Sequence, residues 1–151
     1  MKKAIILILT FAAVILLLLF HLRRQLREKH DICEAVFRYQ LDNYASEIPT
    51  AFLLRVEEKE PPEEFFKRFK GHPLPVMTYS KFSIARSIPE HIYENSSITL
   101  KVEKVERISD REAKVEGEIY IAPLNATGWE YKLEKQNGRW IVKSAVCVWI
   151  S

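Results

Sequence analysis

The sequence predicts an α+β domain in which one long and one short helix pack on a curved antiparallel sheet of about five to six strands, behind an N-terminal transmembrane helix. Three observations predict this arrangement. An uncharged apolar run occupies residues 4–22. Apolar residues recur at helical spacing over residues 31–49. Strand-like alternation dominates from residue 76 to the end. The chain therefore divides into an anchor with basic flanks, residues 1–30, and a single domain, residues 31–151.

The apolar run begins at Ala4 and ends at Leu22, and only Thr10 and His21 within it are polar. Its 19 residues come close to the roughly 20 that a helix needs to cross a hydrocarbon core of about 30 Å. A cleaved signal peptide has a shorter apolar stretch, followed by small residues at the cut. A soluble helix that is apolar all round would need a larger core than this chain offers. The run is therefore predicted to be a retained single-pass anchor in a lipid bilayer.

The orientation of this anchor has two alternatives, because both of its flanks are basic. Two lysines precede the run, and Arg23, Arg24, Arg27 and Lys29 follow it. A count of positive charges favours a cytoplasmic domain. A short basic leader before a long apolar run is instead typical of a signal-anchor that exports the domain. We favour export across the plasma membrane of a prokaryote.

The basic flanks also account for the apparent basicity of the chain. It carries 23 Lys and Arg against 20 Asp and Glu, and six of the basic residues lie within the first 29 positions. From residue 31 onward, 17 bases face 19 acids. A nucleic-acid-binding domain needs a basic face with interleaved aromatic residues, so the sequence predicts no nucleic-acid partner.

The long helix is predicted over residues 31–49. Asp31, followed three residues later by Glu34, fits a capping box at its start, and Pro49 marks its end. The alternative is a helix that runs unbroken from the anchor, since the basic segment between them contains no helix breaker. The expected apolar face carries Ile32, Cys33, Val36, Phe37, Leu41 and Tyr44, with Gln40 beside them.

A strand and a short helix follow. Residues 50–58 alternate between apolar and polar side chains and are predicted to form a strand. Pro62 suits the first turn of a helix, and Gly71 suits its C-terminal cap. Between them, Phe65, Phe66 and Phe69 form an apolar stripe. The short helix is therefore expected to be held almost entirely by its phenylalanines.

Five further strands are predicted over residues 76–85, 97–109, 113–122, 129–135 and 139–151. The strand over residues 97–109 is long, and we expect a slip in its pairing near Lys104. The last two strands flank Asn137-Gly138, the preferred pair for a two-residue type I′ turn. The end of the chain is therefore predicted to be a β-hairpin.

This turn sets the expected register of the hairpin: Leu133 opposite Val142, Tyr131 opposite Ser144, and Trp129 opposite Val146. The face expected to meet the long helix carries Trp129, Tyr131, Leu133, Val142, Val146 and Val148. The opposite face is polar near the turn but apolar near the C-terminus. Either another element covers that apolar end, or a β-bulge swaps the two faces.

No motif in the sequence predicts a catalytic residue, a cofactor site or a metal site. The four histidines stand apart, and no CxxC, HxxxH or HExxH pattern is present. Four glycines supply no phosphate-binding loop. The acidic run over residues 57–64 is typical of a solvated surface. We therefore predict no cofactor.

Cys33 and Cys147 are the only cysteines. In an oxidising compartment, a bridge between them would close a long loop and stabilise the domain by roughly 3–4 kcal/mol. The expected register points Cys147 away from the long helix, which favours the alternative of two free thiols.

The many aromatic residues of the domain have two possible roles. They either fill the core or line an apolar pocket for a small ligand.

The order of elements resembles the cystatin-like, nuclear transport factor 2-like α+β superfamily. The stretches that carry the resemblance are CEAVFRYQLDNY, EEFFKRFKGHPLPV and GWEYKLEKQNGRWIVKSAVCVWI, within residues 31–151. The resemblance implies a cone-shaped domain. Some members are isomerases or dehydratases with an acid or a tyrosine in the cone, and others are association domains without a ligand. The layout is also similar to that of membrane-anchored scaffold proteins of bacterial secretion machines.

Two functions are therefore expected. The first is a single-pass membrane-anchored scaffold that works by association with a protein partner or with further copies of itself. The second is a membrane-tethered domain of the same fold that binds a small molecule or acts as an enzyme. No catalytic residue of the enzyme members carries over to a position in this sequence, which favours the first.

Overall fold

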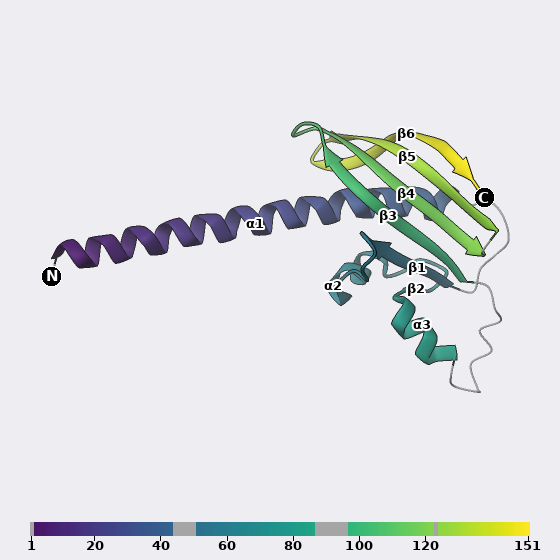
Figure 1. Cartoon of the computed structure of the whole chain (residues 1–151), viewed down its shortest axis with the longest axis horizontal. Helices are drawn as coiled ribbons and strands as arrows, with labels where there is room; N and C mark the ends of the chain where they lie inside the picture. Colours follow the sequence, from purple (N-terminus) through teal and green to yellow (C-terminus); the bar gives the residue numbers. More distant parts are fainter. Residues whose placement is uncertain (1, 44–50, 87–96, 123) are drawn as a thin grey trace.

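The computed structural model describes residues 2–43, 51–86, 97–122 and 124–151, with the side chains of residues 2–10, 85, 86 and 122 left aside. An extended helix enters one side of a six-stranded sheet that curves around its C-terminal third (Figure 1). The elements are α1 (Lys2–Asn43), β1 (Ala51–Val56), α2 (Glu63–Phe66), the 3-10 helix η1 (Lys67–Phe69), β2 (Val76–Met77), α3 (Tyr79–Arg86), β3 (Ser97–Arg107), β4 (Glu112–Ala122), β5 (Asn125–Gln136) and β6 (Arg139–Ile150). The predicted α+β class is confirmed.

Helix α1 is continuous from the anchor region into the domain, which confirms the alternative of an unbroken helix. Neither glycine nor proline interrupts residues 2–43, so no residue favours a break between residues 30 and 31. The predicted cap at Asp31 is wrong, because this residue lies inside α1 and forms an ion pair with Arg68 at 2.7 Å. The helix ends at Asn43, and the predicted stop at Pro49 lies outside the described residues.

Within the described part of the chain, no helix is both long enough and apolar enough to cross a membrane. The predicted span from Ala4 to Leu22 lies partly outside the residues whose side chains are described.

The strand order in the sheet is β2-β1-β3-β4-β5-β6. Four of the strands, from β3 to β6, pair antiparallel as predicted, but β1 pairs parallel with both β2 and β3. The expectation of an antiparallel sheet throughout is therefore wrong at this edge. The chain between β1 and β3 carries α2, η1 and α3, and a connection of that length can return a strand in the same direction.

The strand predicted over residues 76–85 is also wrong beyond Met77, because the chain turns there into α3. Thr78 Oγ1 accepts a hydrogen bond from the backbone of Lys81, and a Glu60 carboxylate oxygen accepts one from the backbone of Ser80. These two acceptors satisfy backbone N–H groups that the first turn of a helix leaves free. Phe82 is buried from α3 against Ala51 and Leu53, which explains why β1 is buried on both faces.

The predicted irregularity in β3 is confirmed, since the pairing with β4 shifts between Val102 and Lys104. The hairpin turn is confirmed as well: Asn137 and Gly138 have φ of 50° and 79°, as a type I′ turn requires. Leu133 pairs with Val142 as predicted.

Beyond this pair, the predicted register is wrong. A bulge between Lys132 and Leu133 in the ladder sets Tyr131 opposite Ala145 and Trp129 opposite Cys147. This is the bulge that we gave as one of two alternatives. It moves Val146 and Val148 off the face that meets α1, and more than half of each side chain is exposed.

The core lies between the C-terminal third of α1 and the concave face of the sheet. Helix α1 contributes Ile32, Cys33, Val36, Phe37 and Leu41, all of which are buried. The short helical segment closes one end of this core with Phe65 and Phe69, as the phenylalanine stripe predicted. Gly71 ends that segment with φ of 96°, a conformation that favours glycine.

Candidate functional site

One buried polar pair lies inside the cone. Gln40 of α1 donates a hydrogen bond through Nε2 to the hydroxyl oxygen of Tyr131 on β5, at 3.0 Å. Both residues are almost fully buried, and Gln40 Oε1 has no hydrogen-bond partner. Burial raises the pKa of the Tyr131 phenol. The phenol therefore stays neutral at physiological pH, and an amide rather than a carboxylate faces it.

Aromatic rings surround this pair. Trp129 stacks on Tyr131 with 6.5 Å between ring centroids, and Tyr39 contacts Tyr131 edge-on with 5.9 Å between centroids. Further along α1, Phe37 contacts Phe65 and Phe69 edge-on. These contacts follow the alternative in which the aromatic residues fill the core.

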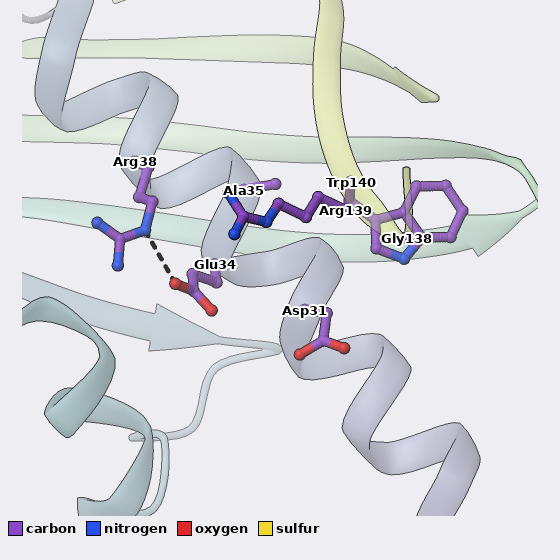
Figure 2. Close-up of a pocket in the computed structure, with 7 residues that line it drawn as sticks. All are labelled: Asp31, Glu34, Ala35, Arg38, Gly138, Arg139 and Trp140. Carbon is purple, nitrogen blue, oxygen red and sulfur yellow. Dashed lines mark hydrogen bonds and ion pairs between the residues drawn. The ribbon is translucent and has the colours of Figure 1, made fainter. Parts of the chain in front are cut away.

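A groove of about 580 Å³ lies outside the cone, between α1 and the start of β6 (Figure 2). In it, Glu34 pairs with Arg38 at 2.9 Å, and it also pairs with Arg68 at 2.7 Å. Its lining residues are Asp31, Glu34, Ala35, Arg38, Gly138, Arg139 and Trp140. The two acids of the groove are thus neutralised by arginines from α1 and η1.

The opposite wall of the groove has one guanidinium without an ion pair and one buried indole N–H without an acceptor in the part of the chain that the structure describes. Among the described residues, Arg139 forms no ion pair, and the buried Nε1 of Trp140 has no acceptor. A guanidinium can bind a carboxylate or a phosphate through two parallel hydrogen bonds. The groove lining carries two acids and two arginines, and of these four groups the Arg139 guanidinium is the one without an ion pair among the described residues.

A second charged cluster joins α1 to two turns of the sheet. Glu28 pairs with Lys135, the last residue but one of β5, at 2.8 Å, and with Arg107 at the end of β3, at 2.9 Å. The hydrogen bond from Lys135 is the main cause that lowers the pKa of the Glu28 carboxyl. Arg107 also pairs with Asp110 in the β3–β4 turn, and the Lys135 ammonium lies 5.5 Å from the centre of the Trp140 ring. This cluster fixes both turns against the helix.

The C-terminal half of β6 is an exposed apolar edge. Strand β6 is last in the sheet order and pairs with β5 on one side. The exposed fractions are 56% for Val146, 57% for Val148, 46% for Trp149 and 78% for Ile150. The Trp149 ring lies flat over Gly128, where a Cβ would come within 2.0 Å of the indole nitrogen. Exposed edges with large apolar side chains are typical of surfaces that bind another chain.

The structure has Cys33 and Cys147 as free thiols, with Cys33 buried and Cys147 exposed. Burial raises the pKa of Cys33 to about 12, so this thiol is unreactive at neutral pH. Among the described residues, no group of three histidine, cysteine or acidic side chains is arranged to hold a metal ion.

Sequence reasoning missed three features of these sites: Gln40, the Glu28 cluster and Arg139. Gln40 carried a signal, since a polar residue stands within the apolar stripe of a helix. The other two depend on how far α1 runs past the turns of the sheet, which no local pattern specifies.

These observations define an α+β domain with a long helix and a six-stranded, curved, open sheet. No family model matches the chain, and no curated protein matches it. Among solved structures, the chain is similar to an NTF-2-like protein of unknown function from Shewanella oneidensis MR-1. The two share 16% identity over 82% of this chain and 93% of that one, with a TM-score of 0.32.

Proposed function

We propose that this protein is a single-pass membrane protein whose domain works by protein–protein association at the membrane surface. The 19 uncharged residues from Ala4 to Leu22 support the anchor. The described apolar side chains of that stretch are exposed and contact no part of the core; Phe20, for example, is 68% exposed. An apolar helix surface of this kind needs either lipid or another apolar surface around it. We propose the plasma membrane of a prokaryote, with the domain exported.

The single observation that carries the association function is the apolar edge of β6. We propose that a second copy of the chain pairs with it as an antiparallel strand. Residues 144–150 contain no charge, no proline and no glycine, so nothing in them opposes pairing. In a pair centred between Val146 and Cys147, Lys143 of one copy would lie opposite Ile150 of the other. Like charges then do not face each other, and apolar side chains meet across the new ladder.

A scaffold role of this kind agrees with the resemblance to membrane-anchored components of secretion machines.

The second candidate function is the binding of a small anionic molecule, and the groove in Figure 2 favours it. Arg139 offers a guanidinium there that forms no ion pair with a described residue. Binding of small carboxylates to the full chain, lost in Arg139→Gln, would support this candidate over association.

Cross-linking and light scattering of the full chain in detergent micelles test the association function. We expect a dimer whose Cys147 thiols are joined by a short bifunctional maleimide, because these residues lie next to the centre of the proposed pair. Val148→Lys should give a monomer, since it adds like charges close to one another on both copies. The matched control is Leu124→Lys, at an apolar residue that is 88% exposed in the β4–β5 turn. A dimer that persists in Val148→Lys would overturn the proposed interface.

A further inference from the structure

Two turns of the sheet lie on the side of the domain that faces the N-terminal part of α1 (Figure 1). They are the β3–β4 turn, at residues 108–111, and the β5–β6 turn, at residues 137–138. The ion pairs of Glu28 with Arg107 and Lys135 fix the position of both turns along the axis of α1. The turns also hold each other, since the backbone N–H of Lys135 donates to the carbonyl oxygen of Arg111 at 2.8 Å.

The position of Glu28 along α1 is close to the end of the apolar run. Glu28 follows Leu22 by six residues, which is about 9 Å along an α-helix. The polar headgroup layer on each side of a bilayer is roughly 5–8 Å thick. Because α1 is unbroken between these residues, the proposed anchor would place Arg107, Lys135 and the β3–β4 turn close to the headgroups of the leaflet through which the helix leaves.

The side chains at this level are mostly cationic. We define the basic rim as the cations of the two turns and of the adjacent helix: Arg23, Arg24, Arg27, Arg107, Arg111, Lys135 and Arg139. Four acids lie among them in sequence, Glu28, Asp110, Glu112 and Glu134, and Asp31 and Glu34 line the groove that contains Arg139. Glu28 and Asp110 are already paired within the rim, with Arg107 and Lys135. Among the described residues, Arg111 and Arg139 have no acidic partner.

A hollow of about 650 Å³ lies between the two turns. It is lined by Asp110, Arg111, Lys135, Gln136, Asn137 and Gly138. Ile108, the first residue of the β3–β4 turn, is 57% exposed. A phosphate group in this hollow would meet the Arg111 guanidinium and the Lys135 ammonium.

From these observations we infer that the basic rim binds anionic phospholipid headgroups and so holds the domain against the membrane in one orientation. The inference rests on the proposed membrane anchor. Arg111 and Arg139 would donate hydrogen bonds to lipid phosphates, because neither guanidinium forms an ion pair with a described acid, although Asp110 and Asp31 lie in the same hollows. Cations near an anionic bilayer surface are attracted within about a Debye length, and the rim lies within that distance.

Hydrogen–deuterium exchange of the full chain in nanodiscs tests this inference. The probes are discs of phosphatidylcholine alone and discs in which three tenths of the lipid is phosphatidylglycerol. We expect the backbone amides of both turns to exchange more slowly in the anionic discs, on the order of fivefold, and this slowing to vanish in Arg111→Gln/Arg139→Gln. The matched control, Lys70→Gln/Lys81→Gln, removes two exposed cations outside the rim and should keep the slowing.

The outcomes separate this inference from the proposed function. If the chain enters the discs and its turns exchange at the same rate in both lipids, the lipid-binding rim is overturned and the anchor stands. Equal slowing in the Arg111/Arg139 variant and in the control overturns the rim as well. A chain that fails to enter discs of either lipid overturns the anchor itself.

Discussion

The two ends of α1 belong to one unbroken helix, but their surroundings are opposite. From Phe11 to Leu22 its large apolar side chains are exposed, whereas from Ile32 to Leu41 the apolar face is buried under the sheet. The first stretch is apolar on all sides, and the second has a single apolar face whose other sides are polar. A helix whose apolar side chains are exposed on all sides needs a second apolar environment, and the proposed bilayer would supply it.

The junction between the two stretches is where this contrast matters most. Residues 23–29 carry four cations, and Glu28 connects the helix to two turns of the sheet. The absence of glycine and proline there keeps the helix continuous, so the domain and the proposed anchor would be rigidly connected. The proposed anchor, the basic rim and the core are therefore parts of one rigid arrangement along α1.

The same substitution in the two stretches should give the largest contrast. Phe37→Ala removes a fully buried ring and should lower the free energy of unfolding of the domain by about 3–5 kcal/mol. Phe20→Ala removes an exposed ring outside the domain and should change it by less than about 0.5 kcal/mol. Urea unfolding of the full chain in micelles, followed by tryptophan fluorescence, measures both. Similar losses in the two variants would show that the stretches are not distinct.

The close packing of β4 against its neighbouring strands depends on Gly117. A Cβ there would lie 2.6 Å from the carbonyl oxygen of Lys101 and 3.3 Å from the Tyr131 ring. We expect Gly117→Ala to destabilise the domain by about 1–3 kcal/mol, because backbone must move to admit the methyl group. The same urea titration measures the loss. An unchanged unfolding midpoint would contradict the described packing of β4.

The buried pair of Gln40 and Tyr131 should show coupling. Gln40→Leu leaves the Tyr131 hydroxyl buried without its donor, and Tyr131→Phe leaves the Gln40 amide unpaired. Each single variant leaves one buried polar group without its partner and should lower the free energy of unfolding. The loss in the double variant should be about 1 kcal/mol smaller than the sum of the two single losses. A double-mutant cycle of unfolding free energies gives this value. Simple additivity would mean that the hydrogen bond contributes nothing.

A smaller effect is expected from pH at the junction. Burial is the main cause that lowers the pKa of His30, so the unfolded chain takes up a proton more readily than the folded one. This contribution to stability is complete above about pH 6.5 and is lost as the pH falls through the lower folded value. The melting temperature should therefore drop between pH 7.5 and 5.5, and less so in His30→Gln. An equal drop in both proteins would assign the effect to other groups.

Local patterns predicted much of this fold because their causes are local. The Asn137-Gly138 turn, the phenylalanine stripe of the short helix and the slip near Lys104 each follow from neighbouring residues. The strand predicted over residues 76–85 failed because Thr78 and Glu60 supply hydrogen-bond acceptors for a helix start, and Glu60 lies far away in sequence. The bulge in the last hairpin depends on packing between strands, which alternation alone does not encode. The Glu28 cluster and Arg139 could not be predicted, because their positions depend on the length of α1 relative to the sheet.

The central claim is that the first part of α1 spans a bilayer and holds the domain at its surface. Flotation of the full chain with vesicles after an alkaline carbonate wash tests it most directly. The account predicts that the wild-type chain floats with the vesicles and that Leu16→Arg/Leu17→Arg, which adds two charges to the middle of the run, stays in the wash. A wild-type chain that is released by carbonate would contradict the claim.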